Sequence, residues 1–338
     1  MKIVLGLSDG VDSTVAAALL KKRGYDVLGL YLANAGEAEL DAARRNAAQA
    51  GIDFQALEIK DVLYEQVCEP FMQEYLRGRT PSPCPGCNRT VKLKALTDMA
   101  DRLGIEQIAT GHYVLKNREH LYMGQSACDQ SYMLARISRE QAKRLALPLG
   151  ALTKTQVRQM ARSLGLSCAE KPDSRENCFI RDMNYAEYIE AHCPDVPGRG
   201  EVFYKGNIVD AHEGIHRYTV GQRWKTDMGE RRAYIKRIDA KDNRIELCLW
   251  EELFTDTVCV GNLSWLEDGY PMEAFEASIR VRHTRWETPR CFARFDGCLL
   301  HVTTQTPLRA PAPGQSVALY KDNMLIGGGT VESSGLTL

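Results

Sequence analysis

A pair of cysteines separated by two residues is the first feature of the sequence that could do chemistry. Cys84 and Cys87 lie in residues 78–96, where three prolines predict an irregular loop before a helix that begins at Arg89 and is capped by Asn88. Cys87 would then lie at a helix N-terminus, where the helix dipole favours the thiolate over a thiol with an ordinary pKa of about 8.5. Such a pair can be redox-active, half of a zinc site, part of an iron–sulfur site or incidental. A zinc site would need a second CxxC pair, which the sequence lacks.

A third cysteine and a histidine are further candidates. Cys178 follows a polar loop rich in Pro, Asp and Ser, like the loop of the CxxC pair, and precedes two apolar residues. It is either a buried filler or a thiol partner for that pair, and the similar loop favours the second interpretation. His112 follows Gly111 at the end of an expected strand. A satisfied core histidine is the alternative there, but the neighbouring glycine favours a functional position.

A polar turn near the start of the chain could bind an anion. Residues 3–7 predict a short buried strand, and apolar residues at helical spacing follow the turn. The first N–H groups of such a helix lack intrahelical partners and can bind phosphate, helped by the hydroxyls of Ser8 and Ser13 and by the small Gly10. Asp12 could hold a divalent metal ion. Because the turn has neither the GxxxxGK[ST] nor the GxGxxG pattern, a plain structural turn is the alternative.

Strands and helices alternate along the first half of the chain. The apolar spacing predicts, in chain order, strand 25–32, helix 37–50, strand 54–59, helix 63–76, strand 105–112, a short helix ending at 134, helix 138–145 and helix 153–164. This pattern predicts an α/β domain with a parallel sheet, whose ligands bind at the carboxyl ends of the strands. Leu32 would contact an adenine ring at that edge, with a core leucine as the alternative.

The pattern changes at about residue 185. A short helix is followed by brief alternating stretches separated by turn residues, which predict a small β-rich central domain and a C-terminal β-barrel. We therefore expect three domains, at residues 1–185, 186–255 and 256–338.

Composition limits the class of protein. The 43 Lys and Arg residues nearly balance the 44 Asp and Glu residues, so nucleic-acid binding would need a local patch. No apolar run approaches the roughly 18 residues of a membrane span, and no leader pattern is visible, so we expect a cytoplasmic protein without membrane association. Eleven cysteines in a chain of 338 residues do not resemble a secreted disulfide scaffold.

Two local clusters combine basic and aromatic residues, as suits RNA phosphates and bases. A solvated strand face is the alternative for both. The first cluster comprises Arg217, Arg223, Lys225, Arg231, Arg232, Lys236 and Arg237, with Tyr218, Trp224 and Tyr234. The second comprises Arg280, Arg282, His283, Arg285 and Trp286.

Taken together, these segments carry a family resemblance. The order SxGxDS after the first strand resembles the pyrophosphate loop of the N-type ATP pyrophosphatases. SDGVDS, GRTPSPCPGCNRTVKL, ATGHY, DQSYML, DSRENCFI, YTVGQR and PGQSVALY follow one another as in the bacterial tRNA-specific 2-thiouridylases, the MnmA family. The resemblance covers nearly the whole chain. It implies an ATP pyrophosphatase fold of the adenine nucleotide α-hydrolase type, and ATP-dependent replacement of the 2-oxygen of a tRNA wobble uridine by sulfur.

The resemblance also implies roles for individual residues. Cys87 would be the nucleophile and Cys178 the persulfide carrier, and the two would form a disulfide between turnovers. ATP with Mg²⁺ would contact Gly6, Leu7, Ser8, Asp9, Gly10, Val11, Asp12, Ser13, Leu32 and Gly111. The tRNA would contact Ser82, Pro83, Cys84, His112, Cys128, Asp129, Gln130, Arg282, His283 and Gln315.

The chain departs from the usual pattern of the family at Asp9 and Cys84, at Cys128 before the DQ pair, and in residues 33–39, which are fewer and less charged than usual. Asp9 stands where glycine is usual and places a carboxylate beside an anion site. Cys84 stands where many members have Asp, so Cys84, Cys87 and Cys178 could instead hold a [4Fe–4S] cluster with one open iron. The sulfur donor would be a cysteine desulfurase or other persulfide relay, or free sulfide. A related enzyme that adenylates a small metabolite, and an RNA-binding protein with a decayed ATP site, are the alternative functions.

Overall fold

The computed structural model describes residues 1–338 except 35, 126, 173–176, 230, 283–287 and 337–338. Its N-terminal half contains a sheet in the order β3-β2-β1-β4-β7, in which each neighbouring pair is parallel. These strands are β1 (Lys2–Leu7), β2 (Asp26–Ala33), β3 (Asp53–Glu58), β4 (Gln107–Ala109) and β7 (Leu145–Ala146). The predicted parallel α/β fold is therefore confirmed.

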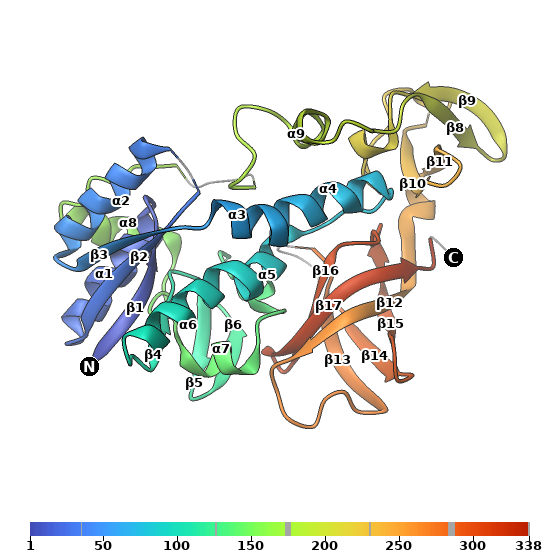
Figure 1. The fold of residues 1–338 in the computed structure, drawn as a ribbon. Helices are drawn as coiled ribbons and strands as arrows, with labels where there is room; N and C mark the ends of the chain where they lie inside the picture. Colours follow the sequence, from blue (N-terminus) through green and yellow to red (C-terminus); the bar gives the residue numbers. More distant parts are fainter. Residues whose placement is uncertain (35, 126, 173–176, 230, 283–287, 337–338) are drawn as a thin grey trace.

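Helices cover both faces of this sheet (Figure 1). Successive side chains of β1 point to opposite faces, so Ile3 and Leu5 join one hydrophobic cluster and Val4 joins another. The first cluster includes α1, α2 and α8, and the second includes α6. The helices of this half are α1 (Val11–Lys22), α2 (Glu37–Ala50), α6 (Leu93–Arg102), α7 (Arg139–Arg144) and α8 (Lys154–Ser163), with a 3₁₀ turn η3 (Ser131–Leu134).

The helix expected to begin at Arg89 begins earlier, at Pro83, and this prediction was wrong. α5 (Pro83–Cys87) continues through the π-helical η2 (Asn88–Lys92) into α6. Prolines fit the first turn of a helix because its N–H groups have no intrahelical acceptor. Asn88 is consequently not a cap; it is buried within the helix, and its Nδ2 donates to the carbonyl of Met133 at 2.8 Å.

A second long helix runs from the parallel sheet toward the β-rich part of the molecule (Figure 1). It consists of α3 (Lys60–Leu63), the π-helical η1 (Tyr64–Cys68) and α4 (Glu69–Leu76). α9 (Tyr185–His192) follows later in the chain, and its Tyr188 and Ile189 share a hydrophobic cluster with this long helix. The two helices form the connection between the parallel sheet and the β-rich part.

The remainder of the chain is built from two antiparallel or mixed sheets. The middle sheet has the order β10-β11-β8-β9, and β12, β15, β14, β13, β16 and β17 form a barrel that the β12–β17 pairing closes. The middle elements are β8 (Gly200–Tyr204), β9 (Asn207–His212), η4 (Ile215–Arg217), β10 (Ala233–Asp239), β11 (Arg244–Leu249) and η5 (Trp250–Leu253). The barrel strands are β12 (Phe254–Trp265), β13 (Ala274–Arg280), β14 (Arg290–Phe295), β15 (Leu300–Arg309), β16 (Ser316–Lys321) and β17 (Met324–Ser334). The predicted C-terminal barrel is confirmed.

The barrel packs directly against the N-terminal half, with which it shares a sheet and a hydrophobic cluster. The hairpin of β5 (Val114–Asn117) and β6 (His120–Met123) extends the barrel sheet beside β17. One hydrophobic cluster contains Val4 and Leu96 of the N-terminal half together with Tyr320 and Leu325 of the barrel. Since the two parts share a core, movement of the barrel would disturb the parallel sheet. Within the described part of the chain, no helix is long and apolar enough to cross a membrane.

Candidate functional site

The loop after β1 is held by its own serine hydroxyls. Ser13 Oγ accepts a hydrogen bond from Ser8 N at 3.0 Å and lies 2.9 Å from Ser8 Oγ, which accepts from Gly10 N at 3.1 Å. Gly10 is extended, with φ −92° and ψ 161°, and immediately precedes α1. The chain therefore turns sharply from β1 into α1, and the first N–H groups of α1 lie at the carboxyl end of the sheet, where an anion could accept from them.

The other residues assigned to ATP are positioned around this loop in different ways. Leu7 and Val11 are buried in the core, so only their backbone could meet a nucleotide. A Cβ on Gly111 would lie 3.0 Å from Ser13 N, which shows that the segment after β4 packs directly on the loop. Gly6 packs similarly against Leu96. Leu32, at the end of β2, is partly buried between two hydrophobic clusters, at the same edge of the sheet as the loop.

Asp12 is paired with protein groups rather than held open for a metal ion. Lys154 Nζ lies 2.8 and 2.7 Å from its two carboxylate oxygens, and the Tyr113 hydroxyl donates to Oδ1 at 2.6 Å. Lys154 is in the first turn of α8, whose cap Thr153 belongs to a capping box with Gln156. Because both oxygens of Asp12 are engaged, this arrangement does not suit direct ligation of Mg²⁺, and Lys154 supplies positive charge instead. Sequence reasoning missed Lys154 and Tyr113.

Asp9, the unusual acid in the loop, also has a cationic partner. Its carboxylate forms an ion pair with Lys171, which lies in the segment leading to Cys178. The pair offsets the negative charge that Asp9 brings to the anion site. Lys171 was not singled out from the sequence, and only its spatial position identifies it as a partner of the loop.

The CxxC pair lies on α5, and the barrel helps to hold the start of that helix. The Ser316 hydroxyl donates to the carbonyl of Ser82 at 3.3 Å, and the Tyr132 hydroxyl lies 3.5 Å from Ser82 Oγ. Thr80 N donates to the carbonyl of Pro313 at 2.7 Å. These bonds fix the loop before Pro83, so the direction of α5 depends on the barrel as well as on the N-terminal half.

Cys87 is a buried thiol, contrary to the expectation of a dipole-stabilised thiolate. It lies at the end of the first helical turn rather than at the N-terminus, and 5% of its surface is exposed. Burial raises the pKa of Cys87 to about 12, and the charge of Lys92 opposes this rise only in part. The resting thiol is therefore protonated at neutral pH, and a reaction at Cys87 requires proton removal or exposure.

This burial predicts a steep pH dependence for modification of Cys87. We expect alkylation by iodoacetamide to accelerate about tenfold per pH unit toward a pKa of about 12, because only the thiolate reacts. Lys92→Met should slow alkylation severalfold at each pH, since it removes the charge that favours the thiolate. Lys94→Met is the matched control, because Lys94 pairs with Asp98. Mass spectrometry that resolves each cysteine measures the rates, and a plateau near pH 8 would contradict the assignment.

Cys178 lies close to the CxxC pair. Phe179 and Ile180, which follow Cys178, pack in the same hydrophobic cluster as Cys87, and Cys178 Sγ lies 3.8 Å from Asn34 Nδ2, just after β2. Burial is the main cause that raises the pKa of Cys87, and the charge on Cys178 adds to this rise. Cys84 and Cys178 are exposed to solvent. The structure thus brings the three cysteines into one region. Among the residues it describes, however, no group of three or more His, Cys, Asp or Glu side chains is arranged to hold a metal ion, so the three thiols do not form a cluster-binding set in this arrangement.

His112 is near the same region but carries no charge at neutral pH. Its Nδ1 lies 2.8 Å from Thr110 Oγ1. Burial and the charge of Lys92 lower the pKa of His112 to about 3. A neutral imidazole can exchange hydrogen bonds with a ligand but cannot neutralise a phosphate.

Several residues assigned to tRNA make structural contacts. Asp129 forms an ion pair with Arg280 at 2.7 Å and accepts from Gly124 N, also at 2.7 Å. Gln130 Oε1 accepts from Tyr113 N at 3.0 Å, and Cys128 packs beside the cluster that contains α1. These contacts order the segment after β6, so any tRNA contact there would use a preformed surface.

On the barrel, Arg282 and Gln315 contact each other, with Arg282 Nε 3.3 Å from Gln315 Oε1. Arg282 Nη2 also donates to the carbonyl of Ala310 at 2.5 Å. His283, Arg285 and Trp286 lie outside the described residues. Because Arg282 Nη2 also lies 3.4 Å from the carbonyl oxygen of Val220, Arg282 links the barrel to the middle part of the chain, and its role in tRNA binding stays a prediction.

The basic cluster of the middle sheet is largely neutralised by local acids. Trp224 is buried, and its Nε1 donates to Asp210 at 3.0 Å, so its indole is not exposed for stacking on a base. The ion pairs are Arg217–Glu190, Arg223–Asp227, Lys225–Asp210, Arg231–Glu251, Lys236–Glu246 and Arg237–Asp239. This pattern favours the interpretation as a solvated, ion-paired face over a free phosphate-binding patch.

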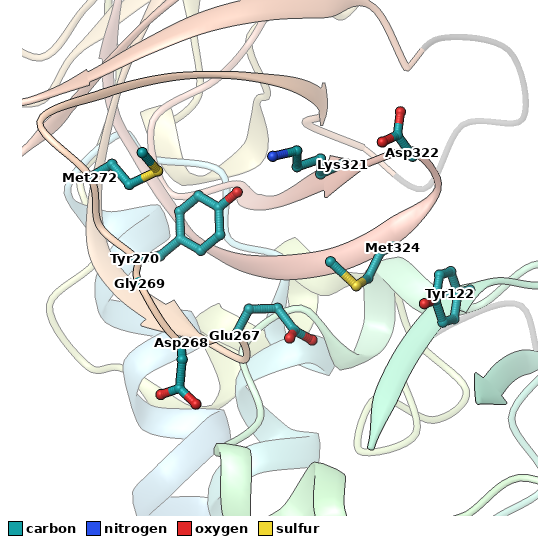
Figure 2. A pocket seen from close by; sticks show the side chains of 9 residues that line it. All are labelled: Tyr122, Glu267, Asp268, Gly269, Tyr270, Met272, Lys321, Asp322 and Met324. Atoms are coloured by element: carbon teal, nitrogen blue, oxygen red, sulfur yellow. The ribbon is translucent and has the colours of Figure 1, made fainter. Parts of the chain in front are cut away.

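A cavity of about 510 Å³ lies elsewhere, between β6 and the barrel (Figure 2). Its lining combines acidic groups with Lys321 and apolar side chains, and none of the residues predicted for the site lines it. The lining residues are Tyr122, Glu267, Asp268, Gly269, Tyr270, Met272, Lys321, Asp322 and Met324. The candidate site therefore lies away from this cavity. It consists of the loop after β1, residues 8–13, which we call the phosphate loop, and of the region around Cys84, Cys87 and Cys178, which we call the thiol region.

Comparisons with known proteins agree with this arrangement. Family models match in succession the tRNA methyl transferase HUP domain at residues 1–182, the tRNA methyl transferase PRC-barrel domain at 186–248 and the aminomethyltransferase beta-barrel domain at 255–331. The tRNA-specific 2-thiouridylase MnmA of Acetivibrio thermocellus is 36% identical over 355 residues, which cover 98% of this chain and 99% of the relative.

Two other relatives give the same result. The tRNA-specific 2-thiouridylases MnmA of Lachnoclostridium phytofermentans and Natranaerobius thermophilus are 36% and 35% identical, and each alignment covers 98% of this chain. The alignments cover 99% and 97% of these relatives, respectively. On the combined strength of the domain matches, the full-length relatives and the loop and cysteine segments, the chain belongs to the MnmA family of tRNA-specific 2-thiouridylases.

Proposed function

We propose that this chain uses ATP to replace the 2-oxygen of the wobble uridine of tRNA with sulfur. The main support is one segment that reaches both parts of the candidate site: Lys171 pairs with Asp9 of the phosphate loop, and Cys178 of the same segment lies near the CxxC pair. An enzyme that activates a carbonyl with ATP and then delivers sulfur needs these two functions side by side. The domain limits 1–185, 186–255 and 256–338 are part of this proposal.

In the first step, the uridine 2-oxygen attacks the α-phosphorus of ATP, and pyrophosphate leaves. The pyrophosphate is held by Ser8, Gly10, Ser13 and the first N–H groups of α1. Gly111 packs directly against this loop and keeps it in position. Lys154 adds positive charge where negative charge develops. Mg²⁺ would arrive with ATP and offset phosphate charge, and we assign no step to direct ligation by Asp12.

In the second step, the terminal sulfur of a Cys178 persulfide attacks C2 of the adenylated uridine, and AMP leaves. The uridine is then joined to Cys178 through a disulfide. Cys87, once deprotonated, attacks Cys178 Sγ, which releases 2-thiouridine and forms a Cys87–Cys178 disulfide. A thiol reductant must reduce this disulfide before the next turnover. The persulfide comes from a cysteine desulfurase or another persulfide relay. Free sulfide is the other source, because HS⁻ can take the place of the reductant and attack Cys178 Sγ of the Cys87–Cys178 disulfide, which gives Cys178–S–SH and releases the Cys87 thiolate.

A [4Fe–4S] cluster on Cys84, Cys87 and Cys178 remains the alternative sulfur carrier. Because the three thiols do not form a metal-binding set among the described residues, we derive no step through a cluster. Iron and acid-labile sulfide in anaerobically purified protein distinguish the two carriers. Fewer than about 0.1 cluster per chain, with full activity on a persulfide donor, would remove the cluster alternative.

The function is tested with tRNA, ATP and a sulfur donor together. We expect 2-thiouridine in nucleosides from the tRNA by mass spectrometry, and pyrophosphate release that rises at least about tenfold when tRNA is added. Pyrophosphate release without tRNA would indicate an enzyme that acts on a small metabolite. RNA binding without pyrophosphate release would indicate an RNA-binding protein. Either result would contradict the proposal.

A further inference from the structure

A cysteine, a histidine and an aspartate form a connected group on the barrel, outside the candidate site. Cys259 on β12 lies directly opposite His301 on β15, and its Sγ is 3.4 Å from His301 Nδ1. His301 Nε2 is 2.6 Å from Asp296 Oδ2. Core residues flank Cys259 and His301 in sequence, so the strand alternation turns both side chains to the outer face of the barrel, where they are partly exposed.

The hairpin turn between β14 and β15 fixes the aspartate. Asp296 Oδ1 accepts from Cys298 N at 2.9 Å and from Leu299 N at 2.8 Å, which leaves Oδ2 for His301. The bonds from Leu299 N and His301 hold the pKa of Asp296 below its ordinary value, so the group is a carboxylate. The carboxylate is therefore a pure acceptor in a fixed position.

This carboxylate determines which nitrogen of His301 carries the proton. Because a carboxylate can only accept, Nε2 of the neutral ring must be protonated, and Nδ1 then has a free lone pair. Nδ1 faces Cys259 Sγ, so the imidazole can remove the thiol proton. The resulting imidazolium would lie between the thiolate and Asp296, which stabilises its charge.

We propose that Cys259 is a nucleophilic thiol that reacts with sulfenyl-type sulfur, meaning the S–S bond of a disulfide or persulfide. His301 takes the thiol proton, and the Cys259 thiolate attacks one sulfur of R–S–S–R. The new S–S bond forms as the old one breaks, and R–S⁻ leaves with the electron pair and takes the proton from His301. With a persulfide R–S–SH, attack on the terminal sulfur gives Cys259–S–SH and R–SH.

The neighbouring groups make the assignment specific. On the neighbouring strands, Arg294 of β14 lies opposite His301 and Ser333 of β17 lies opposite Cys259. Neither of these two neighbours is an acid that could compete with Asp296 for His301. Cys298 lies in the same hairpin turn and is more exposed, but no hydrogen bond from it to an imidazole is found among the described residues. Cys298 is therefore an internal reference for a cysteine without a base.

The test measures disulfide formation at single cysteines in the full-length protein, without tRNA or ATP. Oxidised glutathione is the probe in one arm and inorganic polysulfide in the other, with site-resolved mass spectrometry as the readout. We expect Cys259 to react at least about tenfold faster than Cys298 at pH 7. His301→Gln should lower the Cys259 rate to about that of Cys298, because it removes the base. Asp296→Asn should have the same effect, because an amide can donate to Nε2 and reverse the tautomer of His301.

His120→Gln is the matched control, since His120 is also a partly exposed imidazole paired with a carboxylate, Glu267, at 2.7 Å. It should leave the Cys259 rate unchanged, and thermal melts of all variants report on folding. A preference for Cys259 in one arm alone identifies that class of sulfur as the reactant. Equal rates at Cys259 and Cys298 in both arms, or full reactivity in both folded variants, would overturn the proposal.

Discussion

Replacing Cys178 with serine is expected to lower 2-thiouridine formation at least about a thousandfold, because a hydroxyl cannot carry a persulfide sulfur. The phosphate loop is intact in this variant, so tRNA should still be adenylated. Pyrophosphate should therefore be released in a single burst, stoichiometric with enzyme, and not in steady turnover. Rapid-quench measurement of pyrophosphate, together with nucleoside analysis, separates these two steps.

Cys298→Ser serves as the control, because this exposed cysteine lies on the barrel. It should thiolate tRNA at the rate of the unaltered protein. Thiolation by Cys178→Ser at more than a tenth of that rate, with a persulfide donor, would show that sulfur reaches the uridine by another route.

In a variant that lacks both CxxC thiols, the reaction should stop one step later than in Cys178→Ser, after the uridine has been joined to Cys178. Without Cys87 the disulfide between Cys178 and the uridine has no attacking thiol, and Cys84 must also be replaced because it lies beside Cys87. We therefore expect Cys84→Ser with Cys87→Ser to accumulate a covalent protein–tRNA adduct. Thiol reductant should cleave it and release 2-thiouridine. A denaturing gel with and without reductant shows the adduct.

Lys154→Met is expected to slow tRNA-dependent pyrophosphate release by about 10²–10³-fold. The substitution leaves the Asp12 carboxylate without its cationic partner in the loop that must receive the phosphates, although Tyr113 still donates to it. The repulsion between this carboxylate and pyrophosphate would then oppose the first step. Lys154→Arg keeps the charge and should recover part of the rate.

Two further variants show whether the ion pair acts as a unit. In a double-mutant cycle, Asp12→Asn should partly relieve the defect of Lys154→Met, because it removes the unpaired charge. Lys143→Met is the control, since Lys143 is exposed and pairs with Glu119 at 3.7 Å. If the effects of Asp12→Asn and Lys154→Met simply add, the two side chains act independently and this account of the pair is wrong.

Local chemistry made much of the fold predictable. Helix 37–50 has the predicted limits because Gly51 takes the left-handed conformation, φ 64°, that ends helices. The capping residues Ser138 and Thr153 begin α7 and α8 because their side chains satisfy N–H groups three residues away. Such signals act over a few residues and depend little on the rest of the chain.

The environment of the site was less predictable. The prolines before Cys87 predict a loop, but Pro83 and Pro85 lie in the first turn of α5, where proline is tolerated, and only Pro81 lies before the helix. Cys87 is consequently buried, and its pKa rises instead of falling. Lys154 and Lys171, which pair with Asp12 and Asp9, could not be identified because their partners are 142 and 162 residues away in sequence.

The amino-acid order is enough to locate the phosphate turn, the two segments that contain Cys84, Cys87 and Cys178, and a parallel sheet followed by a β-barrel, because turn chemistry and apolar spacing are local properties. Only the three-dimensional packing of the chain brings these parts together. It shares one core between sheet and barrel, brings Cys178 near Cys87 and pairs each acid of the loop with a distant lysine. The physical reason is that burial and ion pairing depend on distances in space, which the spacing of residues along the chain does not specify.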